Sequence, residues 1–271
     1  MFSGYRIQQS RITYRSVFIK MTILYIIHWF LNPYPGGSMR GIVFDIDDTL
    51  YCRQDLLVKA AEKVLGVRID DWREFIRIYY EKSDVNMAEL ESGEVTTRET
   101  NGWRYNETFR ILGLPYKNED GCIAADVYLE LQSHMVLSEN MKKALDAFAV
   151  DPDTKLAVLT AGESKHQWHK VDMLGLDRWF DRSNIIVTGD IMIPKPDVRL
   201  CRIIEEKLSL KPDELWMIGD NYDKDITGAL DAGWHSIWIN RRGLPAPERR
   251  PDIEVLTDDE LTEKLIELAK Q

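Results

Sequence analysis

The alternation of short apolar runs with helical patterns constrains the fold of this chain more than any other feature. Helical patterns, such as those over residues 163–174 and 197–208, separate the later runs. Each run suits a buried strand, and a strand–helix–strand order implies a parallel sheet with right-handed crossovers. The predicted strands cover residues 41–44, 155–159, 184–187, 215–218 and 235–239. The sequence therefore predicts an α/β fold with a doubly wound, Rossmann-like parallel sheet.

Two carboxylates follow the first predicted strand. The apolar run 42–44 leads directly into Asp45 and Asp47, which stand two residues apart. Ligands of open α/β sheets bind outside the carboxyl ends of the strands, so these acids stand where a ligand is expected. Neighbouring carboxylates can divide labour, one ionised and the other serving as acid and base. A D-x-D-x-T string alone would occur by chance in roughly one such chain in twenty, so it needs support from other segments.

A hydroxyl and a lysine follow further along the chain. The apolar run 156–159 is closed by Thr160 and Ala161, and small residues there let backbone amides approach a ligand. Lys195 stands between two prolines, just before a helical pattern. Taken singly, each has an ordinary interpretation, because a threonine can cap the next helix and a lysine is mostly solvated.

The fourth predicted strand also ends in carboxylates, Asp220 and Asp225; taken singly, Asp48, Asp223 and Asp225 could each be no more than a helix cap. Two acidic strand ends, a hydroxyl and a lysine together suit a magnesium-assisted phosphate site. The four segments, in this order, resemble the four motifs of the haloacid dehalogenase superfamily. The resemblance is to its phosphatase branch with a helical cap inserted after the first strand, and it covers about residues 39–271.

This resemblance implies a role for each motif residue. Asp45 would attack phosphorus and become an aspartyl-phosphate, and Asp47, held partly protonated by its neighbours, would serve as general acid and then base. Mg²⁺ would be held by the Asp45 carboxylate, the Asp47 backbone carbonyl and Asp220, while Asp225 would orient metal-bound water or Lys195. The residues implied to hold the phosphate are Thr160, Ala161 and Lys195.

The resemblance leaves three functions open. The first is a phosphomonoesterase acting on a small phosphorylated metabolite, such as a nucleotide or sugar phosphate. The second is a phosphomutase, which is disfavoured because residues 219–221 resemble the phosphatase version of the last motif. The third is a non-catalytic binding protein, which is disfavoured because every catalytic residue type is present. An acid at position 47 separates phosphatases from the dehalogenases of the superfamily, and the chain lacks the P-loop and dinucleotide-binding glycine motifs.

The strand–helix alternation fails between residues 55 and 135, where the apolar spacing is helical. An insertion directly after the first catalytic strand leaves and re-enters beside the active site, so it is positioned to be a lid. We therefore predict a helical cap domain at 55–135 and a catalytic core at 39–54 and 136–271. Arg98 and Arg104 could contact the leaving group from this cap, although arginines on a polar helical surface are usually solvated.

Composition limits the class of partner. The net charge is −10, and the first 38 residues carry four basic and no acidic side chains, which leaves −14 on the rest. Such a body disfavours nucleic-acid polymers, whereas a bound cation and a lysine could still attract a small phosphate ester. The three cysteines are odd in number and far apart, which predicts free thiols in a reducing compartment such as the cytoplasm.

The first 38 residues do not follow the α/β pattern. Basic residues precede an apolar run at 21–31 and a Pro- and Gly-rich stretch, an order typical of a signal peptide or anchor. The run is short for a membrane span, and Met39 stands just before the first strand. We expect a non-native or upstream-translated extension on a cytoplasmic protein, with an exported or membrane-anchored form as the alternative. The sequence does not indicate an oligomeric state.

Overall fold

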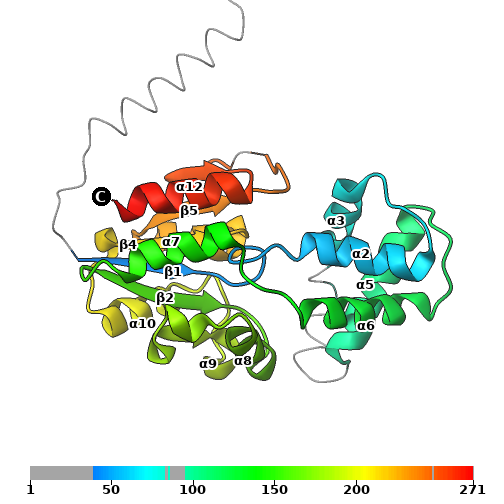
Figure 1. Cartoon of the computed structure of the whole chain (residues 1–271), viewed down its shortest axis with the longest axis horizontal. Coiled ribbons are helices and arrows are strands. Elements are labelled where there is room, and N and C mark those ends of the chain that lie inside the picture. Colours follow the sequence, from blue (N-terminus) through cyan, green and yellow to red (C-terminus); the bar gives the residue numbers. More distant parts are fainter. Residues whose placement is uncertain (1–38, 83–84, 86–94, 246, 271) are drawn as a thin grey trace, which may run out of the picture. The chain divides into compact units, whose positions relative to one another are not determined.

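A six-stranded parallel sheet forms the centre of the structure (Figure 1). The computed structural model describes residues 39–82, 85, 95–245 and 247–270. The strand order is β3-β2-β1-β4-β5-β6, so the first strand lies between the second and the fourth. The strands are β1 (Arg40–Phe44), β2 (Thr154–Thr160), β3 (Ile185–Val187), β4 (Leu215–Gly219), β5 (His235–Ile239) and β6 (Ile253–Val255). The predicted α/β fold with a parallel, Rossmann-like sheet is confirmed.

Five of these strands lie within one residue of the predicted ranges at either end. The sixth, β6 (Ile253–Val255), was missed. It is a three-residue edge strand that pairs in parallel with β5. Strand β3 is equally short but entirely apolar and buried, whereas β6 carries an exposed glutamate at its centre and forms no apolar run, so β6 is defined by its pairing and not by a local signal.

Alternate side chains of β1 pack on opposite faces of the sheet, as the two-residue period of a strand requires. Ile42 and Phe44 belong to a buried cluster with α7, α8 and α12, whereas Val43 belongs to a second cluster with α10 and α11. Helices therefore cover both faces of the sheet, as expected for a doubly wound fold. The helices of this part are α7 (Glu139–Ala149), α8 (Ser164–Met173), α9 (Thr188–Ile191), α10 (Val198–Leu208), α11 (Thr227–Ala232) and α12 (Asp258–Ala269).

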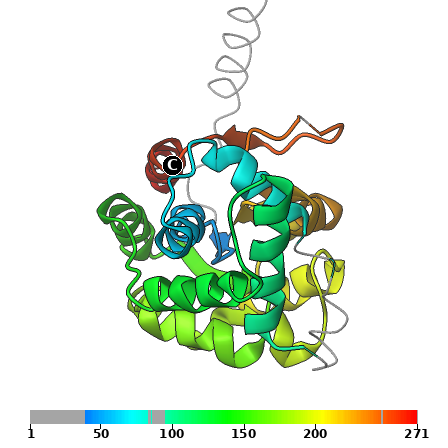
Figure 2. The same cartoon turned by 90° about the vertical axis from the view of Figure 1, so that its right-hand side faces the viewer.

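Among the described residues, four helices follow β1 where the alternation fails, and they pack on one another (Figures 1 and 2). They are α2 (Gln54–Leu65), α3 (Trp72–Glu81), α5 (Thr97–Ile111) and α6 (Asp120–Gln132). Their buried side chains form a cluster of their own, in which the rings of Phe75, Tyr79, Tyr105 and Phe109 meet. The segment is helical as expected, and its boundaries as a separate cap domain stay a prediction.

The N-terminal extension at 1–38, with its apolar run at 21–31, lies outside the described residues. Within the described part of the chain, no helix is both long and apolar enough to cross a membrane. The three cysteines, all within that part, are free thiols.

Candidate active site

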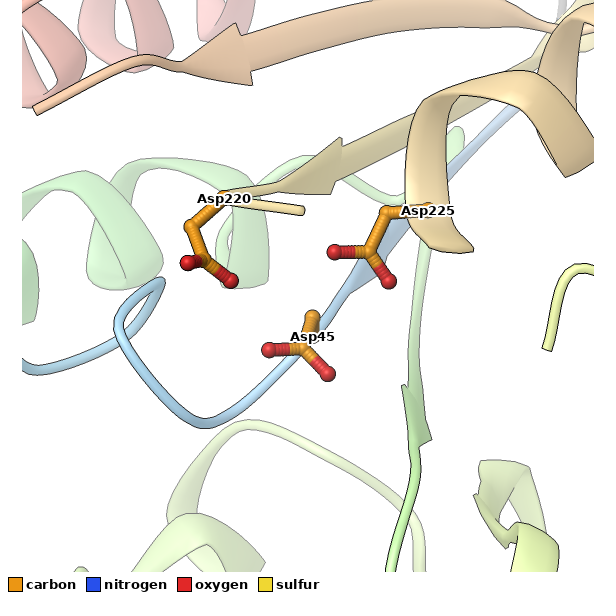
Figure 3. A group of neighbouring side chains, drawn as sticks. All are labelled: Asp45, Asp220 and Asp225. Carbon is orange, nitrogen blue, oxygen red and sulfur yellow. The ribbon is translucent and has the colours of Figure 1, made fainter. Parts of the chain in front are cut away.

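Three carboxylates meet at the carboxyl edge of the sheet (Figure 3). Asp45 follows β1, Asp220 follows the neighbouring β4, and Asp225 lies in η4 (Tyr222–Ile226), a single π-helical turn. One oxygen from each carboxylate lies within 4.8 Å of the others. The structure therefore brings together three of the acids that the sequence singled out.

The register of the two central strands places these acids. Phe44 pairs with Ile218, and the backbone N–H of Asp45 donates to the carbonyl of Ile218 at 2.9 Å. Two parallel strands in this register end at the same level, so the residues that follow them are neighbours. A Cβ atom at Gly219 would overlap the side chain of Asp225, so only glycine lets this acid approach the end of β4 so closely.

Lys195 links two of the acids. Its ammonium donates to Asp45 Oδ1 at 2.8 Å and to Asp225 Oδ1 at 2.7 Å, and its side chain is only 2% exposed. Burial alone would lower the pKa of Lys195, but the charges of Asp225 and Asp45 raise it above its usual range. The lysine therefore stays charged at the centre of the site.

The acids themselves repel one another. The pKa of Asp45 is raised to about 7, because burial and the charges of Asp225 and Asp47 together outweigh the opposing charge of Lys195. Burial and the charge of Asp48 hold the pKa of Asp220 well above its ordinary value. Closely spaced carboxylate oxygens with this excess of negative charge are the donor set that a hard divalent cation such as Mg²⁺ prefers. The residues present fit such an ion.

Thr160 provides a donor that no side chain or backbone group of the described residues uses. It ends β2, next to β1, and its buried hydroxyl Oγ1 has no hydrogen-bond partner there. An unpartnered buried hydroxyl is unfavourable, so a ligand oxygen at this position would relieve it. The next residue, Ala161, accepts a hydrogen bond from Gln167 Nε2 through its carbonyl at 2.8 Å.

The carboxylate of Asp47 is held by a different set of partners. Lys170 Nζ donates to its two oxygens at 2.8 and 2.5 Å, Gln167 Nε2 donates at 3.1 Å, and the Tyr51 hydroxyl also donates. Burial would raise the pKa of Asp47, but the charges of Lys170 and Arg53 hold it well below its usual range. The expectation of a partly protonated Asp47 therefore fails in this structure, because Lys170 keeps the carboxylate ionised.

Lys170 and Gln167 were missed from the sequence, as was Tyr51. The two α8 residues are three positions apart and so share one face of that helix. That spacing was a usable signal, but nothing local shows that this face of α8 meets Asp47, which is 123 residues away from Lys170 in the sequence.

Asp48 joins the loop after β1 to helix α3. It is fully buried in the left-handed region at φ 58°, and its carboxylate accepts from Arg53 N at 2.8 Å and Arg53 Nε at 2.6 Å. The hydroxyl of Tyr80, on α3, donates to the same carboxylate, and Arg241 donates to its backbone carbonyl. Its bond to Arg53 N, at the start of α2, is the helix-capping contact, and it is only one part of what Asp48 does.

The two arginines proposed as specificity residues lie on α5. Arg98 is about half exposed and forms a bidentate ion pair with Asp126 on α6 at 2.6 and 2.7 Å. Arg104 is half-buried, and its Nη1 donates to Asn101 at 3.4 Å. Their role in specificity stays a prediction. The helical pattern of the sequence breaks at Gly93, which predicts a cap loop at 91–99 facing the pocket, but residues 91–94 of this loop lie outside the described residues.

Comparison with known proteins agrees with this geometry. The chain is 26% identical over 244 residues to a glyceraldehyde 3-phosphate phosphatase of Methanopyrus kandleri, covering 86% of this chain and 99% of the relative. It is 39% identical over 101 residues to a phosphoserine phosphatase of Thermus thermophilus, covering 37% of this chain and 40% of the relative.

Solved structures show the same fold. The HAD-hydrolase YfnB of Bacillus subtilis, solved with magnesium, aligns with a TM-score of 0.59 at 22% identity, covering 84% of this chain and 99% of that one. A HAD phosphatase of Thermococcus onnurineus aligns with a TM-score of 0.50 at 27% identity, covering 84% of this chain and 98% of that one.

A family model extends the agreement along most of the chain. The model of the haloacid dehalogenase-like hydrolases matches residues 39–233, which include all four motif segments. The resemblance seen in the sequence is thereby confirmed. The chain belongs to the haloacid dehalogenase-like hydrolase family.

Proposed function

We propose that this protein is a Mg²⁺-dependent phosphomonoesterase that acts on a small phosphorylated metabolite through an aspartyl-phosphate. The observation that carries the proposal is the close approach of three carboxylates, Asp45, Asp220 and Asp225. Lys195 bonds to the first and the last of them, and the buried hydroxyl of Thr160 has no partner among the described residues. Relatives named as phosphatases support the enzyme class, and they favour phosphate release over the phosphomutase alternative.

Asp45 is the proposed nucleophile. Its oxygen forms a bond to phosphorus while the bond from phosphorus to the leaving oxygen breaks, which yields an aspartyl-phosphate and an alcohol. Lys195, which already donates to Asp45 at 2.8 Å, would donate to a phosphoryl oxygen together with Thr160. Asp45, Asp220 and the Asp47 carbonyl would hold Mg²⁺, which when bound offsets negative charge on the phosphoryl oxygens.

Asp47 is the proposed acid and base. It would give a proton to the leaving oxygen and then take one from the water that hydrolyses the aspartyl-phosphate, releasing phosphate. The ion pair with Lys170 keeps the carboxylate ionised, so Asp47 would first have to turn away from Lys170 and take up a proton from solvent before it could donate to the leaving oxygen.

The substrate class is proposed only at a coarse level. The relatives' names refer to glyceraldehyde 3-phosphate and to phosphoserine, both small phosphate esters. A nucleotide or sugar phosphate substrate stays a prediction, as does a cytoplasmic location.

The test is a screen of phosphorylated metabolites for phosphate release with Mg²⁺, with EDTA, and with Mg²⁺ restored in excess of EDTA. We expect release that is lost with EDTA and recovered with Mg²⁺. Asp45→Asn should lower turnover by about a thousandfold or more and should abolish acid-stable trapping of phosphate on the protein. Unchanged activity after exhaustive chelation would exclude the metal role, and turnover of Asp45→Asn within tenfold of the wild type would exclude the nucleophile.

A further inference from the structure

Two arginines from distant parts of the chain meet at one tyrosine. The guanidinium carbon of Arg53 lies 5.2 Å from the centre of the Tyr80 ring, and that of Arg242 lies 5.3 Å from it. Arg53 directly precedes α2, Tyr80 lies on α3, and Arg242 follows β5. The two guanidinium carbons are therefore at most 10.5 Å apart, the sum of the two separations.

Most of the hydrogen-bond donors on these two arginines are not used within the described chain. Arg53 donates through Nε to Asp48 and to the Tyr80 hydroxyl, but its Nη1 and Nη2 have no partner among the described residues. Arg242 forms no hydrogen bond or ion pair with any described residue. A guanidinium carries five N–H donors in a planar fork that matches carboxylate and phosphate oxygens.

Packing on an aromatic ring is the simpler explanation, since arginines often stack on tyrosine. It accounts for one cation on a ring, but it does not explain why two like charges converge on one ring. Arg53 itself pairs with the carboxylate of Asp48, whereas Arg242 has no carboxylate partner among the described residues. Two converging cations with spare donors and a single counter-charge between them are typical of an anion-binding site.

The pair also lies beside the proposed catalytic residues. Arg53 is held by the carboxylate of Asp48, the residue next to Asp47, and Arg242 follows β5, the neighbour of β4 whose end carries Asp220. The positive charge of Arg53 also lowers the pKa of Asp47, the proposed acid and base. An anion bound between these arginines would therefore lie at the same edge of the sheet as the phosphate ester.

We propose that Arg53 and Arg242 bind a second anionic group, a carboxylate or a second phosphate, on the leaving group of the substrate. This inference rests on the proposed phosphomonoesterase function and names its substrate class. The preferred substrate is then a phosphate ester whose alcohol portion is itself charged.

The test uses pairs of esters that differ in this one group. D-3-phosphoglycerate is compared with glycerol 3-phosphate, and fructose 1,6-bisphosphate with fructose 6-phosphate, so that the two pairs distinguish a carboxylate from a second phosphate. We expect the wild type to favour the charged member of at least one pair by tenfold or more in kcat/KM. In Arg242→Gln that ratio should fall by roughly tenfold to a hundredfold, mainly through KM, as expected for a lost charge-assisted hydrogen bond.

Two further variants separate recognition from general effects. Arg250→Gln removes the same charge from an exposed position on the same connection between β5 and β6, and it should leave the ratio unchanged. Arg242→Lys keeps the charge without the planar fork and should give an intermediate ratio. The melting temperature of each variant is measured, and a variant that is not folded is replaced by Arg242→Met.

The outcomes distinguish the two proposals. If no phosphate ester releases phosphate, the phosphomonoesterase function fails and this subsite fails with it. If esters are hydrolysed but the wild type shows no preference for the charged members, the function stands and the anion subsite is wrong. The subsite is also wrong if Arg242→Gln lowers both members of each pair by the same factor.

Discussion

Asp45 combines two opposing requirements in a single side chain. A nucleophilic carboxylate has to be ionised, yet burial and two neighbouring acids raise the pKa of Asp45 to about 7. Only Lys195, at 2.8 Å, favours the charged form among the causes that shift it. Functional sites commonly hold such an arrangement at the expense of stability.

The cost of burying the ionised Asp45 should be visible in the pH dependence of the free energy of unfolding. The pKa of Asp45 is raised on folding from 3.8 to about 7. Its contribution to the free energy of unfolding is therefore fully present below pH 4 and is lost as the pH rises through 7. Asp45→Asn removes the charge and should be more stable than the wild type at pH 8 in EDTA, by on the order of 2 kcal/mol. The difference should shrink toward pH 5, and urea unfolding at both pH values measures it.

Asp223→Asn is the matched control, because it removes an exposed carboxylate from the nearby turn η4. A lower stability of Asp45→Asn at pH 8 would show that the ion pair with Lys195 outweighs burial, which contradicts the raised pKa.

At the scale of elements, helix α8 holds the carboxylate of Asp47 in the loop after β1. Lys170 and Gln167 both donate to the carboxylate of Asp47, and the hydroxyl of Tyr51 completes its partners. Tyr51 in turn accepts from Gln132, at the end of α6, at 3.0 Å. A chain of hydrogen bonds therefore joins the inserted helices to the proposed acid and base.

Removing the α8 cation should destabilise the protein. Lys170→Gln leaves the Asp47 carboxylate buried without its counter-charge, and the loss of one partner of a buried ion pair costs about 3–5 kcal/mol. The double variant Lys170→Gln with Asp47→Asn should recover much of this loss, because neither charge remains. Lys165→Gln removes an exposed lysine from the same helix and serves as the control. Guanidinium unfolding at pH 7 of the wild type, the single variants Lys170→Gln and Asp47→Asn, and the double variant gives the coupling free energy, and additive effects of the two substitutions would contradict the coupling.

For the whole molecule, the sheet order places the proposed site. The strand order reverses at β1, whose neighbours are β2 and β4, and such a switch point is where open α/β sheets bind ligands. Thr160 is the last residue of β2, Asp45 directly follows β1, and Asp220 directly follows β4. Adjacent strands therefore bring the motif residues together. The same convergence concentrates negative charge, which a bound cation would relieve.

Magnesium should therefore raise the stability of the folded chain, whether or not a substrate is known. At a hundred times its dissociation constant, a ligand that binds only the folded state adds about 2.7 kcal/mol. For a domain of this size that corresponds to an increase of roughly 5–10 °C in Tm. Asp220→Asn should abolish most of the increase, and Asp223→Asn, three residues away, should retain it. Scanning calorimetry with Mg²⁺ and with EDTA checks this, and an equal increase in both variants would place the ion elsewhere.

The sequence by itself determined the elements and the motif residues. Strand periodicity, turn residues and the acids at strand ends are encoded within about ten neighbouring residues, so five of the six strands, the family and the positions of Asp45, Asp220 and Lys195 could be read without a structure. Strand β6 could not, because its central residue is an exposed glutamate and it forms no apolar run, unlike the equally short β3.

Tertiary structure alone decided the surroundings of these residues. Lys170 meets Asp47 across 123 residues of sequence, and Arg242, which follows β5, contacts the ring of Tyr80 on α3. Which faces of two helices or loops meet depends on how the whole core packs, and no local pattern carries that information. For this reason the sequence could name the carboxylates, whereas only the packed structure shows which of them is held ionised and by which cation.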